Sequence, residues 1–141
     1  MAEPLKEWKV TKGYGEKYTK FGGIHKGIDS AAQVGTPVYA SVSGVVVHAG
    51  PNSSTGWGPS FGTQIIVDND RFKDGSPGYW TGYCHLSKVK VKANQKIRKG
   101  QLIGWTGNTG RSTGPHLHLQ ILKTRFWNPT KHANPQKWLN A

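Results

Sequence analysis

The stretch Gly114–Leu122 reads GPHLHLQIL, and its alternation of imidazole and apolar side chains is the strongest local pattern in the chain. A period of two is typical of a β-strand, in which successive side chains point to opposite faces. His116 and His118 therefore share one face of the predicted strand, with Cα atoms about 7 Å apart, while Leu117 and Leu119 face the other way. This spacing allows one ring to bind a metal while the other reaches the open position of that metal. The spacing alone does not say which histidine is the ligand.

A second histidine motif lies near the N-terminus, where Gly23–Asp29 reads GIHKGID. His25 and Asp29 point the same way in an extended segment, because their separation is a multiple of the strand period. Imidazole and carboxylate are suitable ligands for Zn²⁺, and three protein ligands plus water are typical of a catalytic zinc site. Either motif alone is commonly a surface pair or a hydrogen-bonded pair. Both together, each in a glycine-rich β context, favour a three-ligand metal site.

The acidic residues restrict the mechanism. The glutamates are Glu3, Glu7 and Glu16, all of which precede His25, and no His-Glu-x-x-His motif is present. That motif supplies two zinc ligands and a glutamate base in one class of metalloproteases. We therefore expect imidazoles to carry the proton transfers, and His85 is the further candidate for this work.

The rest of the chain predicts a mainly β protein. Short runs rich in Val, Ile, Tyr and Trp recur between turn residues such as Gly, Pro, Asn and Ser. The predicted strands are Thr36–Ala40, Gly44–His48, Gln64–Asp68, Tyr79–His85, Val89–Val91, Leu102–Gly104 and Leu117–Leu122. Runs of this length and spacing are typical of antiparallel sheets that form a sandwich or an open barrel. We expect short helical turns at Ser87–Lys90 and near Pro135–Leu139, and a surface loop at Asn69–Tyr79.

Other potentially reactive or ligand-binding residues are better explained by structural roles. Cys84 is adjacent to His85 in a predicted strand and points to the opposite face, so a core position is favoured over a thiol nucleophile. His48 and His132 have no partner in the sequence, which favours surface or structural roles. Gly107–Gly114 is rich in glycine but lacks the lysine and the spacing of a phosphate-binding loop, so we interpret it as a turn. The six tryptophans are expected in the core or in groove walls, and the candidate substrate contacts among them are Trp57, Trp80 and Trp105.

Length and composition favour a single domain that spans residues 1–141. A chain of 141 residues buries about two-thirds of its unfolded surface. The single cysteine, Cys84, excludes an internal disulfide framework and a multi-cysteine zinc site. No apolar run approaches the ~18 residues of a membrane span, and Met1–Val10 lacks the apolar core of a signal peptide. We therefore expect a soluble protein without a Sec signal and without membrane insertion.

The formal net charge of +12 predicts attraction to a polyanion. Nucleic acid, anionic lipid and the anionic polymers of a bacterial wall all meet this description. The basic residues are spread along the chain, with local clusters at Lys88–Lys99 and Lys123–Lys131, and Arg111 lies shortly before the Gly114–Leu122 stretch. There is no arginine-rich arm or nucleic-acid-binding motif, so we expect no nucleic-acid partner. A solvated basic surface explains the charge nearly as well as attraction to a wall.

The motifs above occur together, in this order, in a known family. The chain resembles the lysostaphin/LytM-type peptidoglycan metalloendopeptidases over Val10–Leu139. The segments that carry the resemblance are His25–Asp29 (HKGID), Gly35–Ala40 (GTPVYA), Ser43–Gly50 (SGVVVHAG), Tyr83–Ser87 (YCHLS), Ile97–Gly104 (IRKGQLIG), Gly107–His118 (GNTGRSTGPHLH) and Asn134–Leu139 (NPQKWL). Several matched blocks in the same order make the resemblance specific.

The resemblance implies one zinc ion bound by His25, Asp29 and His118. It also implies that His85 and His116 are catalytic imidazoles on either side of the attacking water. The implied fold is rich in β-strands and has a narrow groove over the metal, bordered by loops.

Family members often carry a tyrosine shortly before the first ligand, which helps to stabilise the tetrahedral intermediate. Tyr18 is the better positional match, and Tyr14 is nearby. Three features depart from the family pattern. Leu119-Gln120 stands where the family usually has Phe-Glu, so a carboxylate beside the metal-binding histidine is missing. Cys84 replaces a more usual small residue, and the Asn69–Tyr79 segment is longer than the usual hairpin.

The expected activity is zinc-dependent hydrolysis of a peptide bond in the stem or cross-bridge of bacterial peptidoglycan. The absence of a signal peptide, and of a wall-binding domain after Leu139, suits a monomeric phage lysin that is released through a holin or carried on a virion. The alternative is a non-catalytic LytM-like domain that binds the wall or activates another hydrolase. Degenerate members of that kind typically lose zinc ligands, and this chain keeps all three.

Overall fold

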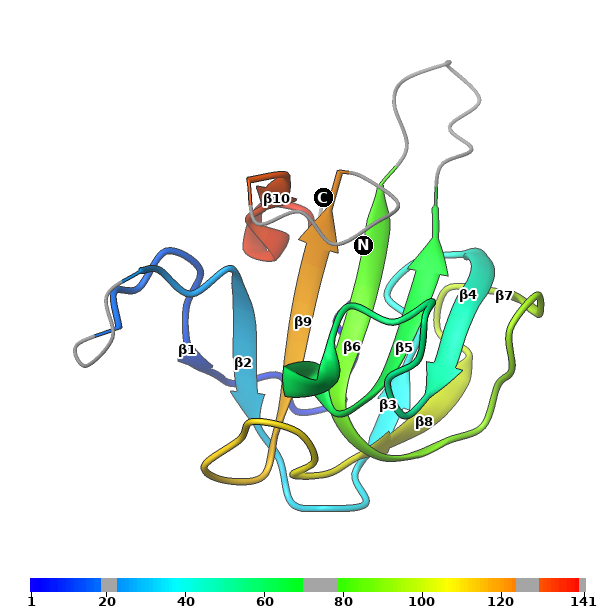
Figure 1. Ribbon diagram of the computed structural model, residues 1–141, viewed down its shortest axis with the longest axis horizontal. Helices are drawn as coiled ribbons and strands as arrows, with labels where there is room; N and C mark the ends of the chain where they lie inside the picture. Colours follow the sequence, from blue (N-terminus) through cyan, green and yellow to red (C-terminus); the bar gives the residue numbers. More distant parts are fainter. Residues whose placement is uncertain (19–22, 70–78, 124–129, 140–141) are drawn as a thin grey trace.

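A computed structural model describes residues 1–18, 23–69, 79–123 and 130–139 (Figure 1). These ranges form an almost all-β protein. Its strands are β1 (Val10–Lys12), β2 (Gly27–Ala31), β3 (Pro37–Tyr39), β4 (Gly44–Gly50), β5 (Thr63–Asp68), β6 (Trp80–Val89), β7 (Lys96–Ile97), β8 (Leu102–Thr106), β9 (His116–Leu122) and β10 (His132–Ala133). Two short 3₁₀-helices, η1 (Pro59–Phe61) and η2 (Pro135–Lys137), complete the described elements. No helix in the described ranges has the length or the apolar character needed to cross a lipid bilayer.

The strands join into one antiparallel sheet with the order β1-β2-β9-β6-β5-β4-β7. Strand β6 holds the sheet together, because it has two partners on the same side along its length. Its first part, Trp80–Cys84, pairs with β9, and its last part, from Leu86 to Val89, pairs with β8. Strand β8 in turn pairs with β3. The sheet therefore curls over itself, and the predicted class of an antiparallel, open β fold is confirmed (Figure 1).

The main core lies inside the curled sheet, as strand alternation predicts. On β9, Leu117, Leu119 and Ile121 are fully buried, while the histidines and Gln120 occupy the opposite face. Ile65 and Val67 of β5 occupy the core together with the two leucines. Each such side chain contributes about 1.5–3 kcal/mol of apolar burial, and this burial fixes the register of β9. The functional face of the strand is therefore set by its apolar face.

Most of the predicted strands are present with shifted ends. The prediction of a helical turn at Ser87–Lys90 and of a separate strand at Val89–Val91 is wrong, because β6 continues without interruption to Val89. The cause is tertiary: Lys88 and Val89 pair with Trp105 and Gly104 of β8, which outweighs the local sequence preference. A turn near Pro135–Leu139 is confirmed as η2.

Most of the predicted loop at Asn69–Tyr79 lies outside the described residues. Its two ends are joined, since the Asn69 N–H donates to the Tyr79 carbonyl at 3.0 Å. The basic cluster at Lys123–Lys131 also lies largely outside the described residues.

Candidate active site

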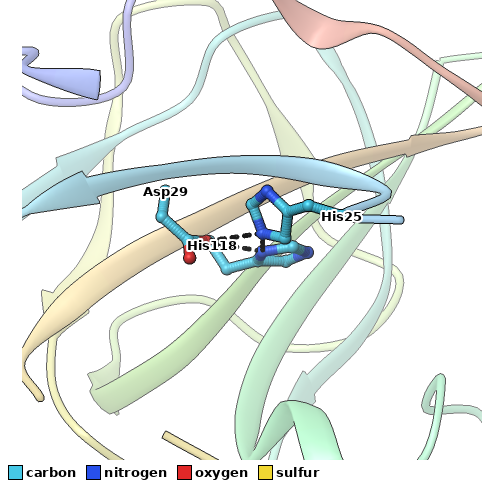
Figure 2. A group of neighbouring side chains, drawn as sticks. All are labelled: His25, Asp29 and His118. Atoms are coloured by element: carbon cyan, nitrogen blue, oxygen red, sulfur yellow. Dashed lines mark hydrogen bonds and ion pairs between the residues drawn. The ribbon is translucent and has the colours of Figure 1, made fainter. Parts of the chain in front are cut away.

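Three side chains from two segments converge on one face of the sheet (Figure 2). His25 lies just before β2, Asp29 lies on β2, and His118 lies on β9. Antiparallel pairing of β2 with β9 places Asp29 directly opposite His118. Asp29 Oδ1 is 2.7 Å from His118 Nδ1 and 3.2 Å from His25 Nε2, and the two ring nitrogens are 3.2 Å apart. The pairing register therefore joins the two histidine motifs of the sequence.

Hydrogen bonds on the far sides of both rings fix which nitrogen faces the centre. His25 Nδ1–H donates to the Gly13 carbonyl at 3.1 Å, and His118 Nε2–H donates to Gln120 Oε1 at 2.8 Å. Since both acceptors are oxygens without a proton, a neutral ring keeps its lone pair on the nitrogen that points inward.

These inward lone pairs and the Asp29 carboxylate form a site that suits a cation. Three acceptor atoms at such short separations repel one another unless positive charge lies between them. A triangle of this size also has a point about 2 Å from each corner, which is the distance at which zinc binds nitrogen and oxygen ligands. The donor set therefore fits a zinc ion, with the fourth position open.

The Asp29 carboxyl shows the effect of positive charge at this point. Burial alone would raise its pKa, but hydrogen bonds from the His118 and His25 rings, and the positive charge that these rings carry when protonated, outweigh burial and hold the pKa far below its usual value. A cation bound between the same atoms would act in the same direction. Asp29 is thus ionised at neutral pH. Gly27 allows β2 to approach closely, because a Cβ at that position would lie 2.5 Å from the Leu119 carbonyl and 2.6 Å from the His118 ring.

Two further imidazoles lie beside this triad. His116 Nδ1–H donates to the Gly114 carbonyl at 2.7 Å, and His116 Nε2 is 3.6 Å from Asp29 Oδ1. His85 Nδ1–H donates to the Thr109 carbonyl at 2.7 Å, and the His85 and His116 ring centroids are 4.8 Å apart. Burial lowers the pKa of His85 to about 4, although its bond to Thr109 and the Asp29 charge act in the opposite direction. At neutral pH His85 is therefore a neutral ring whose Nε2 is available as a proton acceptor.

Of the two tyrosines suggested by the sequence, Tyr18 lies at the rim of the site. Its ring packs edge-on against His25, with centroids 6.1 Å apart, and the side chain is 40% exposed. Burial and the nearby Asp29 charge raise its pKa, so the hydroxyl keeps its proton. The Tyr14 hydroxyl instead contacts Nδ1 of His132, which assigns both of those residues to a structural contact.

The remaining candidates are mostly structural. Cys84 is completely buried, and burial raises its pKa well above the usual value, as its predicted core position requires. His48 is buried and bonds to the Gly50 carbonyl and the Thr55 hydroxyl. Trp57 and Trp80 are 4% and 7% exposed and belong to a second apolar cluster.

Sequence reasoning did not identify several residues that shape the site. These are Gly13 and Thr109, whose carbonyls orient His25 and His85, and Phe61, whose ring centroid is 5.9 Å from that of His118. The sequence named Gln120 only as a departure from the family pattern, whereas in the structure its side-chain oxygen orients the His118 ring. Thr109, Gly13 and Phe61 act through tertiary contacts that no local pattern indicates.

Comparison with known proteins identifies relatives across nearly the whole chain. The sequence is 42% identical over 142 residues to lysostaphin of Staphylococcus staphylolyticus, which covers 99% of this chain and 27% of that protein. It is 38% identical over 120 residues to the peptidoglycan DD-endopeptidase ShyA of Vibrio cholerae, which covers 82% of this chain and 25% of that protein. The chain thus spans about a quarter of the length of these curated relatives.

Solved structures agree with the sequence relationships. The catalytic domain of lysostaphin from Staphylococcus simulans matches with a TM-score of 0.78 and 36% identity over 95% of this chain and 93% of that one. The catalytic domain of the prophage-encoded M23 protein EnpA from Enterococcus faecalis matches with a TM-score of 0.73 and 31% identity over 96% and 95%. A zinc-containing peptidase from Vibrio cholerae matches with a TM-score of 0.72 and 28% identity over 94% and 37%.

The family model of peptidase family M23 matches residues 23–135, a range that includes the three converging side chains and both neighbouring imidazoles. The chain belongs to peptidase family M23.

Proposed function

We propose that this protein is a zinc-dependent endopeptidase that hydrolyses peptide bonds in the stem or cross-bridge of bacterial peptidoglycan. The observation that carries the proposal is the convergence of His25 Nε2, Asp29 Oδ1 and His118 Nδ1 within 3.2 Å of one another. The likeness to lysostaphin, an antimicrobial peptidase, and to ShyA, a peptidoglycan DD-endopeptidase, supports the substrate class.

His25, Asp29 and His118 would hold one zinc ion, and the likeness to the zinc-containing peptidase of Vibrio cholerae supports this choice of metal. When bound, the ion would polarise the scissile carbonyl and lower the pKa of a water molecule at the site. The one carboxylate leaves a net positive charge for this task. The Gly13 carbonyl and Gln120 keep both ligand rings in the orientation that the metal needs.

His85 and His116 are suited to the proton transfers. Each ring donates its Nδ1–H to a backbone carbonyl, so its Nε2 is free to accept a proton from water and to return it to the leaving amine. The low pKa of His85 keeps that ring in the accepting form at neutral pH. The protonated hydroxyl of Tyr18, at the rim beside His25, is placed to donate to the developing oxyanion.

The test is release of peptide fragments from purified sacculi, with and without a chelator. We expect wild-type protein to release fragments, chelation to abolish the release, and zinc to restore it. Asp29→Ala should be inactive, while His48→Gln, which removes a buried histidine outside the site, should remain active. Release that is unaffected by metal removal would contradict the proposal. Wall binding without fragment release would instead favour the non-catalytic, wall-binding alternative.

We further propose that residues 1–141 act as one monomeric catalytic domain in phage-driven lysis, after release through a holin or on a virion. The likeness to the prophage-encoded EnpA domain supports this setting. Cells that express the chain in their cytoplasm should lyse only when a holin is also expressed. Lysis without a holin would contradict the release route, and sedimentation of the purified chain measures its oligomeric state.

A further inference from the structure

Thr109 contacts the site through three hydrogen bonds that connect three segments. Its carbonyl accepts the His85 Nδ1–H at 2.7 Å. Its hydroxyl donates to the Leu86 carbonyl at 2.7 Å and accepts the Thr63 N–H at 3.1 Å. One residue of the loop before β9 is thus bonded to β5, to β6 and to the ring of a histidine beside the metal ligands.

The place where Thr109 bonds is irregular in the sheet. Thr63 and Leu86 are paired across β5 and β6, and the register shifts immediately beyond this pair. His85 has a φ of 63°, in the left-handed region that a residue with a side chain rarely adopts. At this residue β6 also changes its partner from β9 to β8. The direction of the His85 ring therefore depends on contacts that hold an unfavourable backbone conformation.

The loop that carries Thr109 is itself fixed against the loop around η1. A Cβ at Gly62 would lie 2.5 Å from backbone and side-chain atoms of Thr109, and a Cβ at Gly110 would overlap the Gly62 backbone. Both glycines have positive φ, and the Arg111 N–H donates to the Ser60 carbonyl at 2.8 Å. Because Gly62 and Gly110 have no side chains, the two loop backbones pack directly against each other, and this close packing leaves Thr109 little freedom to move.

We propose that Thr109 is a positioning residue for the His85 imidazole. Its hydroxyl bridges the irregular pair Thr63 and Leu86, and this bridge sets the carbonyl that orients the His85 ring. Loss of the hydroxyl lets the bulge relax and moves His85 Nε2 away from the scissile bond. The inference rests on the proposed proton transfer by His85, because a displaced ring slows turnover only if it handles the proton.

The decisive substitutions are Thr109→Val, which keeps the shape of the side chain and removes the hydroxyl, and Thr109→Ser, which keeps the hydroxyl. We expect Thr109→Val to lower kcat by about tenfold or more, since small displacements of a catalytic group have large effects on rate. KM and zinc content should stay within about twofold of wild type. Thr109→Ser should restore kcat to within about threefold. Thr109→Ala, which leaves room for a water, guards against misfolding of the valine variant and should lower kcat at least about threefold.

Thr106→Val is the matched control. The buried Thr106 hydroxyl also bridges two groups, since it donates to the Gln33 carbonyl at 2.6 Å and accepts the Thr36 N–H at 3.0 Å. Neither hydrogen bond of this hydroxyl involves His85, so its loss should lower the melting temperature and change kcat by less than about threefold. An equal fall in kcat for Thr106→Val and Thr109→Val, a rise in KM in place of the fall in kcat, or failure of Thr109→Ser to restore kcat would overturn the proposal.

A second measurement separates this inference from the proposed function. The His85 Nδ1–H proton should exchange slowly with solvent in wild type, Thr109→Ser and Thr106→Val, and at least about tenfold faster in Thr109→Val. This NMR measurement does not depend on whether the protein is enzymatically active. Inactive wild-type protein with the expected exchange pattern would refute the hydrolase and leave the bridge intact, whereas unchanged exchange in Thr109→Val would refute the positioning role alone.

Discussion

The side-chain oxygen of Gln120 lies 2.8 Å from Nε2 of His118, two residues earlier on the same face of β9. An oxygen acceptor thus occupies the place where a carboxylate was expected from the family pattern. Removal of this acceptor by Gln120→Met should weaken zinc binding by about 10- to 100-fold, because the ring loses its fixed tautomer and orientation. Gln120→Glu should bind zinc at least as tightly as wild type. Competition with a chelating dye measures both affinities, and equal affinity for the methionine variant would contradict the role.

Substitution of His116 and of His118, the two histidines of β9, should have different effects on zinc binding and on kcat. His118→Ala should lose bound zinc, because it removes the nitrogen of a proposed ligand. His116→Ala should keep about one equivalent of zinc and lower kcat by about 10²- to 10⁴-fold, the usual effect of a lost proton-transfer group. Mass spectrometry of the native protein measures metal content. Equal zinc loss in both variants would show that the assignment of ligand and catalytic imidazole is wrong.

Acid should destabilise the protein partly through His85. In the unfolded chain the pKa of His85 is 6.5, whereas in the folded protein burial lowers this pKa to about 4. Between these values the unfolded state holds more protons, so the free energy of unfolding falls as the pH falls. In chelator, His85→Gln should reduce this loss between pH 7 and pH 4 by about 1–2 kcal/mol, an estimate reduced for the partial exposure of the ring. Urea unfolding at several pH values measures it, and identical slopes for both proteins would contradict the shift.

The thiol of Cys84 should be inert in the folded protein. It is completely buried, and burial raises its pKa well above the usual value, so neither access nor ionisation favours reaction. At pH 8 we expect alkylation at less than about one-hundredth of the rate in denaturant. Cys84→Ser should retain catalytic activity, because the thiol takes no part in the proposed chemistry. Rapid alkylation that abolishes activity would contradict this prediction and would indicate a functional role for the thiol.

Attraction to an anionic wall should depend on the basic segment Lys88–Lys99. Its six basic side chains are all exposed, they are interspersed with the buried Val91 and Ile97, and no carboxylate lies among them. Replacement of Lys90, Lys92 and Lys96 by Gln should weaken binding to sacculi by about three- to tenfold at low salt. The difference should vanish near ~0.5 M salt, where charges are screened within a few ångströms. Hydrolysis of a short neutral peptide should be unchanged, and a salt-independent defect would point to misfolding.

The sequence predicted the parts of this protein that depend on local periodicity. The alternation around His116 and His118 identifies the strand, its buried face and its functional face. Resemblance to the family then proposed His118 as the ligand and His116 as the catalytic histidine, a choice that spacing alone left open. The direction of the His85 ring could not be predicted, because it depends on a left-handed residue held by Thr109. Likewise, the turn expected at Ser87–Lys90 is absent because β8 pairs with that segment, and only the folded sheet brings β8 there.

The pairing of β2 with β9 has a consequence for biosynthesis. Asp29 emerges from the ribosome 89 residues before its partner His118. A nascent chain therefore cannot bring the three side chains of the proposed metal site together until β9 has paired between β2 and β6. The proposed hydrolase would therefore be inactive until β9 has paired with β2, and products of interrupted synthesis that end before β9 would lack one of the three converging side chains.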